Sequence, residues 1–208
     1  MKLSARPLPA LLAAFRSSEP TPGGGSAAAL AGAVGAALLA MVAGLARPRT
    51  TSADDLQRLA AAGARCAELS ERLAALIDQD SDAYDLVVGA FRLPKGSDEE
   101  KRARGGAIQT AMHAATNTPL DVMRSCADAI AEAEVVAAFG NSNASSDVAV
   151  ALELLGAALR GAKVNVEINL ESVKDEAFAA TARADAERVA AAAAEETAAA
   201  RARLTNPA

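Results

Sequence analysis

The sequence predicts an all-α protein, a bundle of long and mostly antiparallel helices. Hydrophobic residues, many of them alanine, make up 51% of the chain, whereas aromatic residues make up 2%. Alanine is the strongest helix former. No segment alternates apolar and polar residues over the length of a strand. We therefore expect Leu, Val and Ile to fill a core between helices that approach closely at Ala and Gly.

Capping signals and breakers place the helices along the chain. Ser52 with Asp55 is a capping pair, and Ser97 with Glu100 forms an S-x-x-E capping box. Pro119 is expected to end a helix near Asn117, because a proline inside a helix removes a hydrogen bond. The expected helices cover about residues 9–17, 26–46, 54–92, 97–117, 120–139, 145–170 and 173–204.

Length and charge exclude several classes of protein. A chain of 208 residues suits one domain, here residues 1–208. The net charge of −5, with scattered Lys and Arg, argues against a nucleic-acid partner. Cys66 and Cys126 are isolated, so we interpret them as buried small hydrophobes and expect no metal site. The N-terminus shows no secretory signal pattern, which favours a cytoplasmic protein.

The stretch from Pro20 to Ala46 opens with three glycines and continues as an uncharged run of small residues. Its length would span a membrane. Its Ala and Gly content makes a weak span, so we expect no membrane partner and favour a buried helix or a subunit interface. Gly23–Gly25 lack the G-K-[ST] ending of a P-loop. A glycine loop that leads into a helix N-terminus nevertheless suits an anion.

Asp80 is the main catalytic candidate because it interrupts an apolar helical stripe. At about 100° per residue it falls near the centre of that face. A buried lone carboxylate is costly unless it is paired or protonated. The alternative is a structural aspartate bonded to a neighbouring helix, and spacing alone does not decide. The other members of the stripe are Leu73, Leu76, Ile77, Tyr84, Val87, Val88 and Phe91.

A second polar set lies on the helix that begins near Ser145. Asp147, Asn165 and Asn169 project from one face, but about 27 Å separates Asp147 from Asn165. One small ligand therefore cannot contact both within a subunit. Each also has a structural interpretation, since Asp147 can complement the helix N-terminus and the asparagines can bond to other helices. The only histidine, His113, is expected at the surface.

Several segments, taken in order, resemble the cyclodeaminase/cyclohydrolase family of folate enzymes. They are PTPGGGSAAALAGAVGAALLAMVAGL, LIDQDSDAYDLVVGAFRLPK, TPL, GNSNASSDVAV and KVNVEINL. The resemblance extends from about Phe15 to Phe178. It implies an all-helical homodimer that binds folate in a cleft near the subunit interface. The distant Asp147 and Asn165 could then serve one site from different subunits.

The resemblance also implies roles for individual residues. Asp80 matches the aspartate of the family's D-x-x-A-[FY] segment, the proposed proton donor and acceptor. Burial would raise its pKa and suit it to that role. No metal and no tightly bound cofactor is implied, because a tetrahydrofolate derivative is the substrate. Arg92 is a further candidate partner for the anionic tail of the folate. The implied substrate-binding residues are Gly23, Gly24, Gly25, Ser26, Lys95, Asn141, Asn143, Asp147, Asn165 and Asn169.

Three functions follow from the resemblance. The leading one is methenyltetrahydrofolate cyclohydrolase, which opens the N5,N10-methenyl bridge to give 10-formyltetrahydrofolate. The second is formiminotetrahydrofolate cyclodeaminase, which releases ammonia, and the third is a folate-binding dimer without turnover. Family members carry an Asn-Leu-Thr and a Gly-Lys-Lys-Tyr segment after the first long helix. Here the region between Gly44 and Asp55 has only Arg47 and Arg49 as basic residues, which favours the third.

Overall fold

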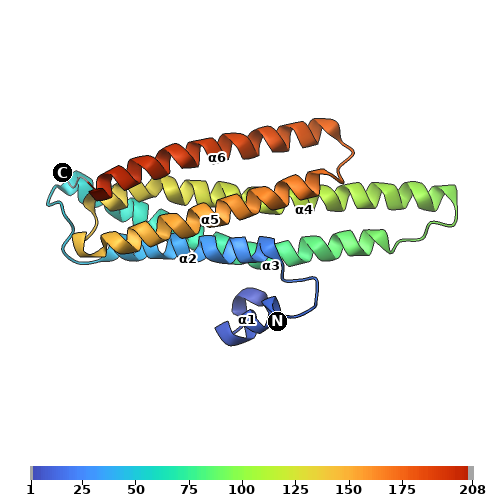
Figure 1. Ribbon diagram of the computed structural model, residues 1–208, viewed down its shortest axis with the longest axis horizontal. Helices are drawn as coiled ribbons and strands as arrows, with labels where there is room; N and C mark the ends of the chain where they lie inside the picture. Colours follow the sequence, from blue (N-terminus) through green and yellow to red (C-terminus); the bar gives the residue numbers. More distant parts are fainter. Residues whose placement is uncertain (1, 206–208) are drawn as a thin grey trace.

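The computed structural model describes residues 2–205, and every regular element in that range is a helix (Figure 1). The expected all-α bundle of long helices is confirmed. The elements are η1 (Leu3–Ala5), α1 (Leu8–Phe15), α2 (Gly24–Gly44), α3 (Ala53–Phe91), α4 (Asp98–Phe139), η2 (Ser142–Ala144), α5 (Ser145–Leu170) and α6 (Glu176–Thr205).

The core forms around α4, which packs against α2, α3, α5 and α6. Helix α2 fits closely between its neighbours because it presents glycines to them. A Cβ at Gly32 would lie 2.8 Å from Sγ of Cys126, and one at Gly35 would lie 2.8 Å from Cγ of Leu155. Although α2 has the length and hydropathy of a membrane span, 44% of its most apolar window is buried inside the bundle. This is the packing of a core helix.

Both expected capping motifs begin a long helix. The Ser52 side chain accepts a hydrogen bond from the Asp55 amide at the start of α3. Ser97 and Glu100 form a reciprocal capping box at the start of α4. These caps satisfy amide groups that the first turn of a helix leaves without an intrahelical partner. The predicted positions of these helix starts are confirmed.

The predicted break at Pro119 is wrong, because α4 continues through it. Proline has no amide hydrogen, so Pro119 leaves the carbonyl of Ala115, four residues earlier, without its usual donor. The Asn169 side chain on α5 supplies one, as its Nδ2 donates to the Ala115 oxygen at 2.7 Å. An interhelical hydrogen bond therefore replaces the missing intrahelical one.

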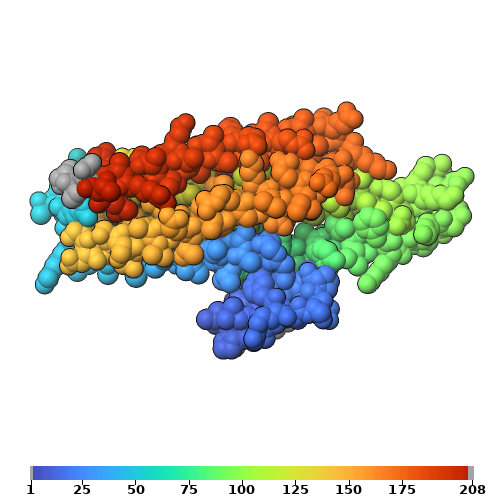
Figure 2. Space-filling model, viewed as in Figure 1, coloured from blue at the N-terminus to red at the C-terminus, as the bar shows by residue number. Residues whose placement is uncertain are grey.

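The hairpin of α3 and α4 extends beyond the ends of α2 and α5 (Figure 1). The chain before α2 forms a small lobe against the side of the bundle (Figure 2). Asp78 on α3 anchors this lobe, because its carboxylate accepts hydrogen bonds from the Leu3 amide and the Ser4 hydroxyl, each at 2.5 Å. Asp80, two residues further along α3, lies close to the point where the cover by α2 ends.

Candidate active site

The glycine loop and the first turn of α2 form one wall of the candidate site. Gly23 is the N-cap of α2 and uses no side chain to cap it. The amide of Ser26 donates to Oδ2 of Asp80 at 2.8 Å. The Ser26 hydroxyl lies 2.8 Å from the same oxygen. The helix N-terminus therefore faces a carboxylate, as its dipole favours.

The Ser26 hydroxyl can serve both protonation states of Asp80. Its oxygen is also 3.0 Å from the backbone oxygen of Ile77. When Asp80 is ionised, the hydroxyl can donate to the carboxylate. When Asp80 is protonated, the hydroxyl can donate to Ile77 and accept the proton of Asp80. A proton can thus join or leave this carboxyl without the loss of its partner.

Burial raises the pKa of Asp80 above its ordinary value. The hydrogen bonds from the Ser26 side chain and backbone act in the opposite direction, but burial is the larger effect. A carboxyl whose pKa moves toward neutrality can accept and return a proton within one reaction.

Gly25 lets the Asp80 carboxyl approach the backbone of α2 closely, and Asn165 lies at contact distance from Gly24. A Cβ at Gly25 would lie 2.1 Å from Oδ1 of Asp80, so no side chain fits there without a rearrangement. A Cβ at Gly24 would lie 3.9 Å from Nδ2 of Asn165. That nitrogen donates to the Gly161 oxygen at 2.9 Å. Four predicted groups therefore meet at the start of α2: the glycines, Ser26, Asp80 and Asn165.

Beyond Asp80, the apolar stripe of α3 is open rather than buried, which corrects the expectation from the sequence. Tyr84 is 40% exposed and Phe91 is 52% exposed. The reason is that α2 starts beside Asp80 and does not cover the last turns of α3 (Figure 1). An uncovered apolar surface therefore adjoins a partly buried carboxyl. This combination can hold a flat apolar ligand with its reactive atom near Asp80.

The other predicted residues lie away from this cluster. Lys95 is exposed in the α3–α4 connection. At the opposite end of the bundle, the Asn141 side chain donates to the Ala46 oxygen and accepts from the Asn143 amide. Asp147 lies in the first turn of α5, as its structural interpretation requires. Since α5 is one continuous helix, about 27 Å separates Asp147 from Asn165.

Asn169, His113 and the cysteines have structural surroundings. Asn169 uses its amide to complete α4 at Pro119. The prediction of a surface His113 is wrong, because its ring stacks on Phe178 with centroids 4.0 Å apart and its Nε2 is buried. Cys66 and Cys126 are buried as expected, and burial raises the pKa of both thiols to about 12.

Comparison with known proteins identifies the family. A model of the formiminotransferase-cyclodeaminase family matches residues 7–188. The chain belongs to this family. The chain is similar to a methenyltetrahydrofolate cyclohydrolase from Methylorubrum extorquens, with 44% identity over 163 residues, which are 78% of each protein. The family resemblance of the sequence motifs is thereby confirmed.

Two further similarities connect this chain to cyclodeaminases. A formimidoyltransferase-cyclodeaminase from Sus scrofa is 34% identical over 182 residues. The aligned residues make up 86% of this chain but 33% of the Sus scrofa protein, so this chain spans about a third of the length of that protein. A crystal structure of formiminotetrahydrofolate cyclodeaminase from Thermotoga maritima superposes with a TM-score of 0.84 at 29% identity, covering 98% of both chains. The fold of the family thus extends over almost the whole chain.

Proposed function

We propose that this protein is a methenyltetrahydrofolate cyclohydrolase that uses Asp80 as its proton carrier. The observation that carries the proposal is the Asp80–Ser26 pair at the start of α2, where burial raises the pKa of the Asp80 carboxyl. The 44% identity to a protein of that name favours the same substrate.

The proposed reaction needs one proton to be taken and then returned. Water adds to the positively charged methenyl carbon, and the Asp80 carboxylate takes a proton from it. The resulting neutral intermediate has a tetrahedral carbon that bears a hydroxyl and is bonded to N5 and N10. As the carbonyl forms, the C–N5 bond breaks and Asp80 returns its proton to N5. The hydroxyl proton leaves to solvent, so one water is consumed and one proton is released.

In this scheme the glycine loop and the open face of α3 position the substrate. The flat pteridine ring lies along the uncovered side of α3 near Tyr84, with N5 toward Asp80. Gly25 leaves room for the Asp80 carboxyl beside the α2 amides, and Asn165 lies next to Gly24. Held in this way, the carboxyl and the methenyl carbon need no large rearrangement before reaction.

The experiment follows the loss of methenyltetrahydrofolate absorbance when purified protein is added. We expect the wild type to accelerate it and Asp80→Asn to reduce the rate by at least about 100-fold, the lower range for a lost general acid–base. Asp82→Asn is the matched control, because Asp82 is exposed and lies about 200° around α3 from Asp80, and it should keep activity within about threefold. Equal rates for wild type and Asp80→Asn would refute the role of Asp80.

The similarity to cyclodeaminases favours a second candidate, which uses the same carboxyl. In that reaction N10 attacks the formimino carbon, and the proton on Asp80 assists the departure of ammonia. Ammonia release from formiminotetrahydrofolate, without acceleration of methenyl hydrolysis, would establish it. Folate binding without either reaction would instead identify the non-catalytic dimer.

We also propose that the protein is a homodimer with α2 at the interface. Val34 and Met41 project outward from α2 and are 45% and 43% exposed. On α5, Val164 and Ile168 are both 58% exposed. A second copy that covers these side chains could bring Asn141, Asn143 and Asp147 of one subunit toward Asp80 of the other. Light scattering after gel filtration should give twice the chain mass of 20.9 kDa. Met41→Glu should lower the measured mass toward that of a single chain.

A further inference from the structure

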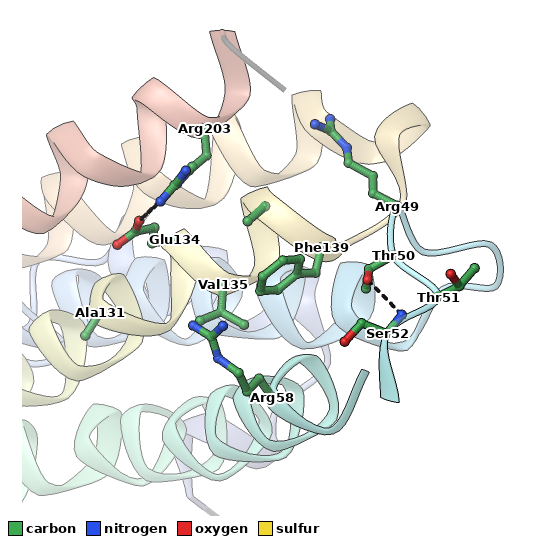
Figure 3. Close-up of a pocket in the computed structure, with 11 residues that line it drawn as sticks. Arg49, Thr50, Thr51, Ser52, Arg58, Ala131, Glu134, Val135, Phe139 and Arg203 are labelled. Carbon is green, nitrogen blue, oxygen red and sulfur yellow. Dashed lines mark hydrogen bonds and ion pairs between the residues drawn. The ribbon is translucent and has the colours of Figure 1, made fainter. Parts of the chain in front are cut away.

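A pocket of about 560 Å³ opens at the end of the bundle remote from Asp80. It lies between the start of α3 and the C-terminal ends of α4 and α6 (Figure 3). Arg49, Arg58 and Arg203 reach it from the α2–α3 connection, α3 and α6, and Figure 3 shows them on three sides of Phe139. Glu134 is the only carboxylate among the lining residues. The lining therefore carries an excess of positive charge.

Arg49 is the unusual member of this set. Its Nε and Nη1 are buried and have no hydrogen-bond partner within the described chain. A buried donor without a partner costs stability, and the cost is larger for a charged group. The main chain holds the connection in place, because the Arg49 amide donates to the Phe139 oxygen at 2.9 Å. Arg47, two residues earlier, has a φ of 62°, a conformation that side chains other than glycine rarely adopt.

The other two arginines have weak or exposed partners. Arg203 pairs with Glu134 at 3.0 Å, and both side chains are about half exposed. Arg58 reaches Asp55 at 3.5 Å, and its guanidinium lies 5.2 Å from the centre of the Phe139 ring. An anion at the pocket could therefore recruit all three guanidiniums, which bind carboxylate and phosphate oxygens in pairs. Phe139 and Val135 offer an apolar surface beside them.

We propose that this pocket binds a multivalent anion through Arg49, with Arg58 and Arg203 as supporting charges. Its ligand carries carboxylate or phosphate groups. Two sources fit that chemistry, a free small anion and the glutamyl tail of a folate. Arg58 and Asp80 are 22 residues apart on the continuous helix α3, which corresponds to about 33 Å. A short-tailed folate at Asp80 of the same chain does not reach the pocket, so such a tail comes from a second subunit or a second folate.

The test is titration calorimetry with inorganic phosphate and, separately, with γ-linked triglutamate. We expect at least one probe to bind with a Kd below about 1 mM. Arg49→Met should weaken that binding by about 10- to 100-fold, the value of hydrogen bonds to a charged group. Because the variant removes two buried donors that have no partner within the described chain, its melting temperature should be equal to or higher than that of the wild type. Arg102→Met is the control, since Arg102 is exposed at the other end of α4.

The outcomes separate the two sources. Binding of phosphate, together with an unchanged KM for mono- and triglutamyl substrates in Arg49→Met, supports a free anion. Binding of triglutamate and a KM that rises only for the triglutamyl substrate support the folate tail, and this second arm rests on the proposed function. The calorimetry does not rest on the proposed function, so the binding of anions to the pocket can be tested even if the protein has no enzymatic activity.

Several results would overturn the proposal. They are the absence of saturable binding by either probe, equal affinity in wild type and Arg49→Met, and equal losses in the Arg102→Met control. Should Arg49→Met fold poorly, Arg58→Met provides the same comparison. A lower melting temperature in Arg49→Met with unchanged affinity would show that Arg49 only supports the α2–α3 connection.

Discussion

The apolar stripe of α3 from Leu73 to Phe91 has two halves, before and after Asp80, with the same sequence pattern but different surroundings. Leu73 and Ile77, before Asp80, are 0% and 2% exposed, whereas Tyr84 and Phe91, after it, are 40% and 52% exposed. The pattern identifies the apolar face of a helix but not what covers it. Helix α2 begins beside Asp80 and covers only the first half, so Asp80 lies on the border between a core and an open surface. The position of this border gives the carboxyl both burial and access.

The largest expected effect tests the difference between the halves directly. Leu73→Ala should lower the free energy of unfolding by about 2–5 kcal/mol, because it leaves a cavity in a closed core. Phe91→Ala should cost less than about 1 kcal/mol, because much of its ring already contacts water. Urea denaturation of both variants measures the contrast. Equal losses would show that the open half is covered in solution, as a subunit interface would cover it.

A substitution at the border should affect activity more than stability. Gly25→Ala places a methyl group on the Asp80 carboxylate, whose nearer oxygen would be 2.1 Å away. The carboxyl must move, and a displacement of about 1 Å can reduce the rate by about 100-fold. The methenyl-absorbance assay measures this loss.

Gly89→Ala is the matched control on the open half of α3. A Cβ at Gly89 would have no atom within 4 Å, so this variant should keep its activity and gain slightly in stability. Full activity in Gly25→Ala would contradict the assigned position of the Asp80 carboxyl.

In the core, the hydrogen bond from Asn169 to the Ala115 carbonyl, which replaces the one that Pro119 cannot form, can be tested directly. Asn169→Ala should cost about 1–3 kcal/mol, because the Ala115 carbonyl loses its donor. Pro119→Ala supplies an amide to the same carbonyl, so the loss should be much smaller in the double variant. Denaturation of the two single variants and the double variant gives the coupling. Strictly additive effects would refute the exchange of donors.

The smallest effect is a change in pH dependence. Ser26→Ala removes a hydrogen bond that lowers the pKa of Asp80, so that pKa should rise further above its ordinary value. The carboxylate form that takes the proton from water then requires a higher pH. The acidic limb of the kcat/KM profile should therefore move to higher pH, whereas a uniform loss of rate at every pH would argue against the assignment.

Much of the fold could be predicted because its signals are local. Ser52, Ser97 and Glu100 act within one helical turn, and a cap is visible in a few residues of sequence. The break predicted at Pro119 was wrong because the hydrogen bond that Pro119 cannot form is replaced by one from Asn169, which is distant in the sequence and belongs to another helix. The same reason explains the half-covered stripe of α3, because the cover depends on where α2, a different helix, begins.

The candidate site was predictable to the same extent. The helical spacing singled out Asp80 by its conflict with an apolar face, and the family motifs singled out the glycines. The contact between Gly25 and the carboxyl could not be predicted, because it depends on how closely two helices cross. Arg49 was visible only as a basic residue in an altered segment. That its Nε and Nη1 are buried without a partner in the described chain depends on packing between distant segments.

The projecting hairpin of α3 and α4 sets the length of the exposed apolar surface beside Asp80. A paired helical arm is stiff, so the distance from Asp80 to its tip is fixed by residue count, about 16 Å for residues 80–91. Removal of seven residues from each helix of the arm would shorten that surface by about 10 Å and leave the Asp80–Ser26 contact in place. The length of the arm can therefore change in whole helical turns without a change at the Asp80–Ser26 pair.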